Sequence, residues 1–324
     1  MEVSEEEKLT LRAVLREFGL SNTQLKRAVS CGKVLIRGVP TADTGRMVRR
    51  PEVSYVPDAR RLTPGRDLCI LYKDPDLVVV WKPSGWLSVR APGRSRDSDV
   101  VSYVGKLYGG SFVVHRLDEG TSGAMMVALN EATQFKIKAL LEKHDIERRY
   151  LALVRGRPEK DRWTMETHFV RNRGDGLRGS GEAGPEAKHA VTHFEVVQRL
   201  ETGVALVRAT LESGRTHQVR IHLAESGHPV LGDKLYADSG SARRFPRVAL
   251  HAAVLGFKHP STGESKYFDI PLADDLEQFR RGAATKKPLE PGSRREEKRK
   301  SKRLSPVAKR GAKVKAKKVR KKGR

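Results

Sequence analysis

The sequence predicts an α+β fold, with a mixed, largely antiparallel sheet and flanking helices. Between residues 67 and 281, apolar runs rich in β-branched residues follow one another with short turns, as adjacent antiparallel strands do. Strict alternation of strand and helix is missing, and so is any glycine-rich loop for dinucleotides or nucleoside triphosphates. Two helices are expected, at Glu131–Lys143 and around His217–Glu225. The expected strands are Leu77–Trp81, Phe112–His115, Ala124–Leu129, Tyr150–Arg155, Val191–Val197, Val204–Leu211 and Val248–Phe257.

A small module is expected ahead of this sheet, in residues 1–61. Apolar residues from Leu9 onward recur at helical spacing until Gly19, which can end the helix. Ser21 is a good N-cap for a second helix, and a short strand is expected at Lys33–Arg37. Two helices with basic residues, followed by such a strand, resemble the S4 RNA-binding domain. An ordinary small α/β cap on the main body is the alternative.

Positive charge is concentrated behind the main body, which is expected to cover residues 62–282. Residues 283–324 carry 19 Lys and Arg against 3 Asp and Glu, a net +16 of the chain's +25. They hold no Ile, Phe, Trp or Tyr, so burial cannot offset the entropy of ordering them. We expect a disordered polycationic arm that binds phosphate backbones with little sequence preference. A solubilising tail, or one that binds anionic membranes, is the alternative.

Other features limit the compartment and the chemistry. No apolar stretch is long enough to span a bilayer, and the polar start is not a secretory signal. Cys31 and Cys69 lie far apart without the spacing of a metal site, which indicates a reducing compartment. The histidines lack nearby cysteines or a paired acid motif, so no metal is expected. We expect a cytoplasmic protein, monomeric and without membrane contact.

The nonapeptide HRLDEGTSG, residues 115–123, is the most informative string in the chain. It places one carboxylate, Asp118, in a turn after an apolar run, with the cation Arg116 two residues before it. A strand–loop–strand with a single acid at its tip suits a carboxylate that reaches a substrate. The alternative is a β-turn whose aspartate bonds its own backbone.

Two later strings accompany this nonapeptide. RRYLALV, residues 148–154, has the pattern of a strand and contains Tyr150. GRTHQVRIHL, residues 214–223, combines two arginines with two histidines. In this order the strings resemble those of the RluA-type pseudouridine synthases, and the resemblance covers about residues 70–275. It implies the sheet of that enzyme family and isomerisation of uridines in structured RNA, ribosomal RNA ahead of transfer RNA.

The resemblance also implies a role for individual residues. In the family, the aspartate of the nonapeptide is the catalytic nucleophile, here Asp118, and an arginine pairs with it, here Arg220. The tyrosine of the second string, Tyr150, stacks on the target base and is the leading candidate to accept the C5 proton. Arg116 enters the space that the flipped uridine leaves. The supporting residues implied are Lys82 in a structural turn, Arg215 at a phosphate or bracing the loop, and His217, for which a structural role is favoured over acid–base chemistry.

Pseudouridine formation breaks a glycosidic bond and rejoins the base through carbon. No redox step or energy input is involved, so we expect no cofactor. A non-catalytic RNA-binding ribosome-assembly factor with the same fold is the alternative function, although an intact set of Asp118, Tyr150 and Arg220 disfavours it. A DNA-compacting protein would explain the basic arm but not the main body. The sequence leaves open which uridine is modified and whether Asp118 attacks ribose, attacks the base or promotes elimination to a glycal.

Overall fold

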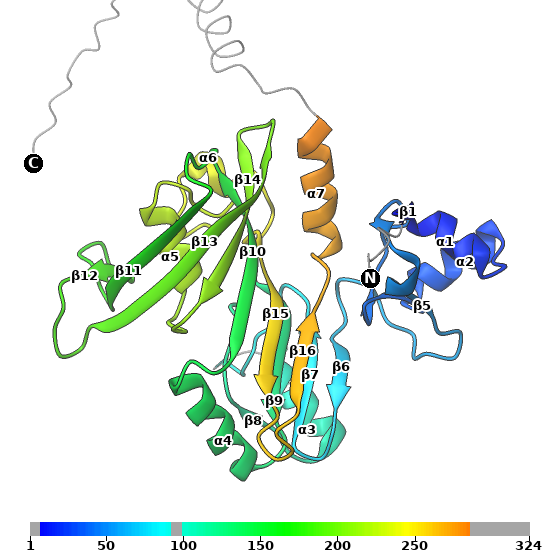
Figure 1. Cartoon of the computed structure of the whole chain (residues 1–324), viewed down its shortest axis with the longest axis horizontal. Coiled ribbons are helices and arrows are strands. Elements are labelled where there is room, and N and C mark those ends of the chain that lie inside the picture. The colour runs from blue at the N-terminus through cyan, green and yellow to red at the C-terminus, as the bar shows by residue number, and fades with distance from the viewer. Residues whose placement is uncertain (1–6, 92–98, 286–324) are drawn as a thin grey trace, which may run out of the picture. The chain divides into compact units, whose positions relative to one another are not determined.

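A single large sheet forms the frame of the main body (Figure 1). The computed structural model describes residues 7–91 and 99–285. The strands of the sheet are β6 (Cys69–Lys73), β7 (Leu77–Lys82), β8 (Phe112–Val113), β9 (Ser122–Ala128), β10 (Glu147–Arg155), β11 (Arg162–Val170), β12 (Gly179–Gly181), β13 (Lys188–Leu200), β14 (Val204–Leu211), β15 (Leu250–Lys258) and β16 (Ser265–Asp269). Their order is β12-β11-β13-β14-β10-β15-β9-β7-β6, with β16 beside β15 and β8 beside β9. Only the β9–β15 pair within this sheet is parallel among the described residues, which confirms the mixed, largely antiparallel α+β prediction.

Helices cover the sheet, and several of them begin at a side-chain cap. Asp99 and Asn130 each accept a hydrogen bond from the backbone N–H three residues on, which satisfies a donor that the first helical turn leaves free. The helices of the main body are α3 (Val100–Tyr108), α4 (Glu131–Glu142), α5 (Gln218–Glu225), α6 (Ser239–Ala242) and α7 (Asp274–Thr285). Within residues 7–91 and 99–285, no helix has the length and the apolar character that spanning a bilayer requires.

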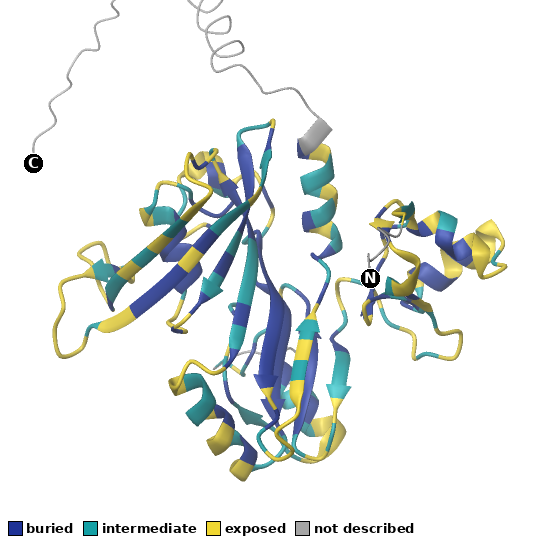
Figure 2. Cartoon of the chain, viewed as in Figure 1, coloured by how far each residue is buried: buried dark blue, intermediate teal, exposed yellow. Residues whose placement is uncertain are grey.

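The central strands are buried on both faces, as their dark blue colour in Figure 2 shows. Every residue of β7 and β9 is buried. Alternate side chains point to opposite faces of a sheet, so Val79 packs with Ile137 of α4, whereas Val78 packs with Val104 of α3. The near-continuous apolar runs in these strands are therefore explained by helices on both sides. This covered centre makes a rigid base for the loops at its edge.

The structure contains more elements than the sequence pattern indicates. All seven expected strands form, although the one expected at Phe112–His115 stops at Val113. The sequence pattern missed β6, β11, β12 and β16, together with α3, α6 and α7. In β11 exposed and half-buried residues alternate and many are polar, which leaves almost no apolar run to detect. Such a strand is held by its neighbour β13 rather than by a core of its own.

The N-terminal module has its own small core. Ser21 caps α2 with a reciprocal capping box, and both expected helices form. The elements are β1 (Leu9–Thr10), α1 (Leu11–Glu17), α2 (Asn22–Ser30), β2 (Val34–Ile36), β3 (Val39–Pro40), β4 (Met47–Val48), a 3-10 turn η1 (Arg50–Glu52) and β5 (Val53–Tyr55). Two small sheets, β1-β4 and β3-β2-β5, complete the module. Its likeness to an S4 domain stays a prediction, and residues 286–324 of the expected basic arm lie outside the described residues.

Candidate active site

The loop that carries Asp118 is tied to its surroundings through backbone atoms. The hydroxyl of Ser88 accepts a hydrogen bond from the backbone N–H of Leu117 at 2.8 Å and donates to the carbonyl of the same residue at 2.6 Å. The N–H of Thr121 donates to the carbonyl of Asp118, which closes a turn around the carboxylate. A glycine is required at position 123, because a Cβ there would lie 2.2 Å from the carbonyl oxygen of Ala252. These contacts fix the position from which the Asp118 side chain projects.

Lys82 lies directly beneath this loop. Its side chain is completely buried, and its Nζ donates to the carbonyls of Pro83, Trp86 and Glu119 at 3.1, 2.7 and 3.3 Å. Burial lowers the pKa of Lys82 to about 7, and the nearby charge of Arg247 acts in the same direction. The lysine thus joins the turn after β7 to the residue that follows Asp118. It contacts the loop but does not line the pocket at Asp118.

Asp118 forms an ion pair with Arg220, and the other side of this arginine forms an ion pair with a second aspartate. Nη1 of Arg220 donates to Oδ2 of Asp118 at 2.8 Å. The other side of the same guanidinium donates twice to Asp233, from Nε at 2.7 Å and from Nη2 at 2.8 Å. Arg220 and Asp233 are 6% and 0% exposed, and Asp118 is 28% exposed toward the pocket. The buried pair fixes the direction of Arg220, so the arginine can aim Asp118.

Asp233 is a site residue that the sequence pattern did not single out. It follows Gly232, which has a left-handed φ of 75° and where a Cβ would lie 1.8 Å from the carbonyl oxygen of Arg247. Its Oδ1 also accepts the backbone N–H groups of Leu235 and Tyr236. Burial opposes ionisation of Asp233, but the hydrogen bonds and charge of Arg220 outweigh it and keep its pKa below the usual range. In the sequence, a glycine followed by an aspartate indicates no more than a turn.

His217 stands on the other side of Asp118. It precedes α5 with a left-handed φ of 60°, a strained conformation for a residue other than glycine. Its Nδ1 lies 2.9 Å from the hydroxyl of Tyr236, and its Nε2 lies 3.8 Å from Oδ1 of Asp118. The second distance is too long for a hydrogen bond. Burial lowers the pKa of His217, so a neutral imidazole faces the carboxylate at neutral pH.

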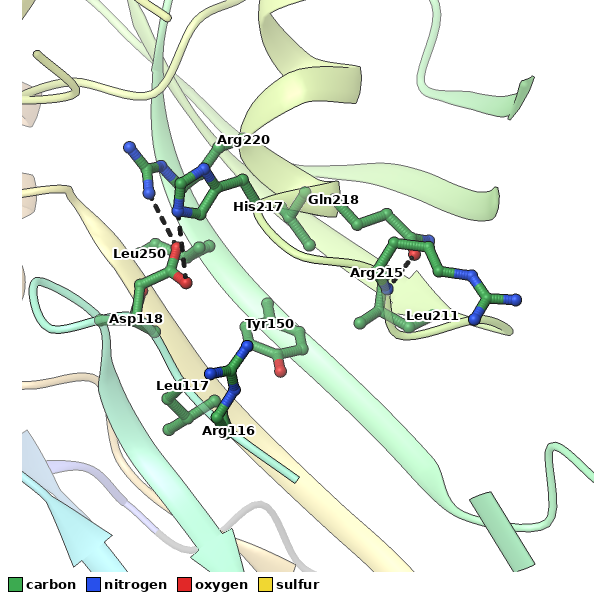
Figure 3. A pocket seen from close by; sticks show the side chains of 12 residues that line it. Arg116, Leu117, Asp118, Tyr150, Leu211, Arg215, His217, Gln218, Arg220 and Leu250 are labelled. Atoms are coloured by element: carbon green, nitrogen blue, oxygen red, sulfur yellow. Dashed lines mark hydrogen bonds and ion pairs between the residues drawn. The ribbon is translucent and has the colours of Figure 1, made fainter. Parts of the chain in front are cut away.

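Tyr150 completes the pocket from the middle of the sheet. It lies on β10, opposite Ala209 of β14 and Ala252 of β15. Figure 3 shows its ring near Asp118 and Arg116, on strand β10. Burial raises the pKa of Tyr150, although the charge of Arg148 opposes this. The phenol therefore stays protonated at neutral pH.

The pocket at Asp118 is the inner end of a large basic cleft. A space of about 50 Å³ is lined by Asp118, Tyr150, His217 and Arg220, among others. It adjoins a cleft of about 1120 Å³, above the range of roughly 300–1,000 Å³ for a small-molecule site. The basic residues of this cleft are Arg90, Arg116, Lys138, Arg148 and Arg215. Of the site residues expected from the sequence, all but Lys82 line the pocket.

A separate group of side chains has the composition of a metal site. Ligand atoms of Asp74, Asp76 and His259 lie within 4.8 Å of one another. However, Nδ1 of His259 accepts the backbone N–H groups of Ser261 and Thr262, which places the proton on Nε2. Nε2 of His259 lies 2.8 Å from Oδ2 of Asp74. The oxygens of Asp74 also accept hydrogen bonds from the Tyr72 hydroxyl and from the backbone N–H groups of Asp76 and Leu77. The group joins turns at the sheet edge and does not fit a cation.

Known proteins resemble this chain over the part that holds the site. Residues 76–225 match the family model described as RNA pseudouridylate synthase. The uncharacterized RNA pseudouridine synthase YlyB of Bacillus subtilis (strain 168) is 34% identical over 273 residues, which cover 80% of this chain and 88% of the relative. Ribosomal large subunit pseudouridine synthase D of Vibrio cholerae is 31% identical over 283 residues, or 79% of this chain and 85% of the relative. The dual-specificity RNA pseudouridine synthase RluA of Escherichia coli (strain K12) is 36% identical over 209 residues, or 63% and 93%.

Solved structures give the same picture for the fold. The chain is similar to human RNA pseudouridylate synthase domain containing 1, with a TM-score of 0.54 and 26% identity over 71% of this chain and 100% of that chain. Human RNA pseudouridylate synthase domain containing 4 is similar with a TM-score of 0.55 and 22% identity, over 68% of this chain and 94% of that chain. The second likeness bears on the fold alone.

Proposed function

This chain belongs to the RNA pseudouridine synthase family, and we propose that it converts specific uridines of structured RNA, ribosomal RNA ahead of transfer RNA, into pseudouridine with Asp118 as nucleophile. One observation carries this proposal. Asp118 lies at the inner end of a basic cleft, 2.8 Å from a buried arginine and in the same small pocket as Tyr150. A carboxylate, a cation that aims it and an aromatic face are the groups that the isomerisation needs.

The chemistry follows from the two oxygens of Asp118. Oδ2 accepts the hydrogen bond of Arg220, which aims the carboxylate, while Oδ1 lies 3.8 Å from Nε2 of His217. The bond between N1 of the uracil and C1′ of the ribose breaks, the uracil turns, and C5 bonds to C1′. C5 then loses its proton and N1 gains one, so the isomerisation balances without an oxidant. Attack on ribose, attack on the base and elimination to a glycal all need this ionised carboxylate.

We propose that Tyr150 holds the flipped uracil by stacking and assists removal of the C5 proton. Aromatic faces are the usual support for an unstacked base. Because its pKa is raised, the phenol is protonated at neutral pH. Removal of the C5 proton by its oxygen must therefore be coupled to transfer of the phenolic proton towards N1, the atom that gains a proton in the isomerisation. Arg116, exposed in the cleft, is proposed to fill the gap that the base leaves in the RNA.

Tyr150→Phe separates these two parts of the role. The variant keeps the stacking face, so RNA affinity should stay within a few fold of wild type. Product formation should fall by 10²-fold or more, since general acid–base catalysis contributes about this much. Quenched single-turnover reactions measure the rate. Turnover at the wild-type rate would leave Tyr150 as a stacking platform only.

We divide the chain into an N-terminal module (residues 1–61), a catalytic body (residues 62–282) and a basic arm (residues 283–324). The proposed preference for ribosomal RNA depends on the module and the arm. The match to the ribosomal relative extends over 79% of this chain, against 63% for the dual-specificity relative. Lys26 and Arg27 are exposed on α2 of the S4-like module and can contact phosphates. We propose that both segments bind ribosomal RNA around the body, and that the protein acts as a monomer in the cytoplasm, where ribosomes are modified.

Mapping pseudouridine in cells tests this function directly. Ribosomal and transfer RNA from cells without the gene should each be compared with RNA from cells that carry it again. We expect one or more uridines of ribosomal RNA to lose their pseudouridine and to regain it with the wild-type gene. A loss confined to transfer RNA would contradict the substrate. An unchanged map in both RNAs would favour a non-catalytic assembly factor.

A further inference from the structure

Arg148 is a buried cation without a carboxylate partner. It lies on β10 two residues before Tyr150, and 8% of it is exposed. Its Nη2 donates to the backbone carbonyl of Glu212 at 3.0 Å, and its buried Nε has no hydrogen-bond partner. Within residues 7–91 and 99–285, no Asp or Glu pairs with it. The adjacent Arg149 differs, because it forms an ion pair with Glu147.

Such an arrangement is costly for the free protein. Removing a charge from water costs several kcal/mol unless an opposite charge and hydrogen bonds compensate for it. Burial lowers the pKa of Arg148, and Arg215 adds to this effect, but an arginine stays protonated at any physiological pH. Arg116 and Arg215 line the same cleft and bring further positive charge. An anion is the missing partner at this place.

The surroundings indicate which anion fits. The guanidinium is a planar group whose N–H donors match the oxygens of a phosphate. Its Nε is buried and its Nη2 is bound to the Glu212 carbonyl, so a phosphate would approach from the side of Nη1. Arg148 and Tyr150 both line the cleft, and two residues along a strand lie about 7 Å apart on one face. Gly214 allows the backbone to lie close to the guanidinium, because a Cβ at this position would lie 2.3 Å from Nη1 of Arg148. A base stacked on Tyr150 therefore brings its own phosphodiester near Arg148.

We propose that Arg148 forms a phosphate subsite, which binds the phosphodiester next to the flipped uridine and so anchors the target nucleotide beside Tyr150. This inference rests on the proposed function, because it takes RNA as the substrate. It adds a positioning contact to the base-holding face of Tyr150. A guanidinium that only braced the Glu212 carbonyl would not need a substrate anion.

The test compares ligands with and without phosphate on the full-length protein. Calorimetric titration of wild type with uridine, uridine 3′-monophosphate and uridine 5′-monophosphate should give at least one nucleotide that binds about tenfold more tightly than uridine. Arg148→Gln keeps a donor for the Glu212 carbonyl but removes the charge, so this phosphate preference should disappear. Arg148→Lys should restore part of it. Arg149→Gln is the matched control on the same strand and should keep the preference.

Two results would overturn the subsite. One is a wild type that binds uridine and both monophosphates equally. The other is a folded Arg148→Gln variant that keeps the phosphate preference, or that loses affinity for uridine to the same extent. If Arg148→Gln does not fold, the Nε resonance of Arg148 in the wild type decides, with Arg148→Lys used to assign it. That resonance should shift during titration with inorganic phosphate, and a constant resonance would contradict the proposal.

These measurements do not depend on turnover, so the two proposals can fail separately. A protein that makes no pseudouridine but shows the Arg148-dependent preference would refute the proposed function and keep the phosphate subsite. An active enzyme without that preference would refute the subsite alone.

Discussion

Two groups of charged residues meet in this cleft, and they are compensated in different ways. In the first group, the aspartate cluster of Asp118, Arg220 and Asp233, every charge has a partner from the protein at 2.7–2.8 Å. In the second, the arginine wall of Arg116, Arg148 and Arg215, none has a carboxylate partner within the described part of the chain. The aspartate cluster is complete without a substrate, whereas we propose that the phosphates of the substrate complete the arginine wall.

This difference predicts that one group affects the reaction rate and the other affects RNA binding. A preorganised group acts on the reaction rate, because its geometry does not have to form during the reaction. A group of uncompensated cations acts on binding, because phosphates supply its counter-charges. Changes in the aspartate cluster should therefore alter stability and the chemical step. Changes in the arginine wall should alter RNA affinity and its salt dependence.

The largest effect on stability is expected from Asp233→Ala. It leaves the buried Arg220 guanidinium without its bidentate partner, and breaking a buried pair costs about 3–5 kcal/mol. Denaturant unfolding measures the loss. The control is Asp161→Asn, which breaks an ion pair with Arg199 in which Asp161 is 80% exposed, and which should cost less than about 1 kcal/mol. Equal effects of the two variants would show that the aspartate cluster is no more than surface charge.

A smaller, pH-dependent effect is expected from His222, behind the aspartate cluster. Both of its ring nitrogens lie 2.9 Å from threonine hydroxyls, those of Thr167 and Thr192, and the residue is fully buried. Burial lowers the pKa of His222 to about 4. Between pH 6.5 and pH 4 the unfolded state thus binds a proton that the folded state does not, and stability falls as the pH falls.

His222→Gln removes this titration and sharpens the assignment. The difference in unfolding free energy between wild type and variant should shrink by roughly 3 kcal/mol from pH 7 to pH 4. Denaturant unfolding at several pH values measures it, with His228→Gln as a control because that histidine is only partly buried. A constant difference across this range would contradict a buried, neutral His222.

The smallest effect on the chemical step is expected from the basic arm. Truncation after Thr285 keeps α7 whole and removes 19 Lys and Arg with 3 Asp and Glu, which is the full +16. Affinity should fall for all RNAs, and the slope of log K against log salt should become shallower. The single-turnover rate at saturating RNA and the uridine modified should stay unchanged. A truncated protein that binds as before would make the arm a bystander, and a new target uridine would give it a part in recognition.

Sequence strings were sufficient to propose the residues that act, but not to find those that support them. Asp118, Tyr150 and Arg220 each lie in a short string with its own pattern, and the fold brings all three to one pocket. Asp233 lies 13 residues from Arg220, and only the path of the chain after α5 turns it back to the guanidinium. A lone glycine–aspartate pair carries no sign of that path. Likewise, nothing in the string around Arg148 tells whether a carboxylate faces it.

The fold was predictable where the burial of an element requires a regular pattern of apolar residues in its sequence. The strands β7 and β9 are buried on both faces and appear as continuous apolar runs. The helix α7 is short of apolar residues, although Leu276, Phe279 and Ala283 recur at helical spacing after an acidic first turn. Its place against the sheet is fixed by tertiary contacts such as the buried Leu276. The local pattern of such an element is short, and tertiary packing decides where it lies.

If Asp118 performs the chemical step while the arginine wall provides binding, Asp118→Asn should separate the two. The amide keeps the shape of the side chain but cannot act as the nucleophile. With an RNA that contains the mapped uridine, a single-turnover reaction should give no pseudouridine, while RNA affinity stays within a few fold of wild type. Asp161→Asn, far more exposed, should react at the wild-type rate. Measurable pseudouridine from Asp118→Asn would contradict the account, and so would a loss of RNA binding large enough to explain the lost product.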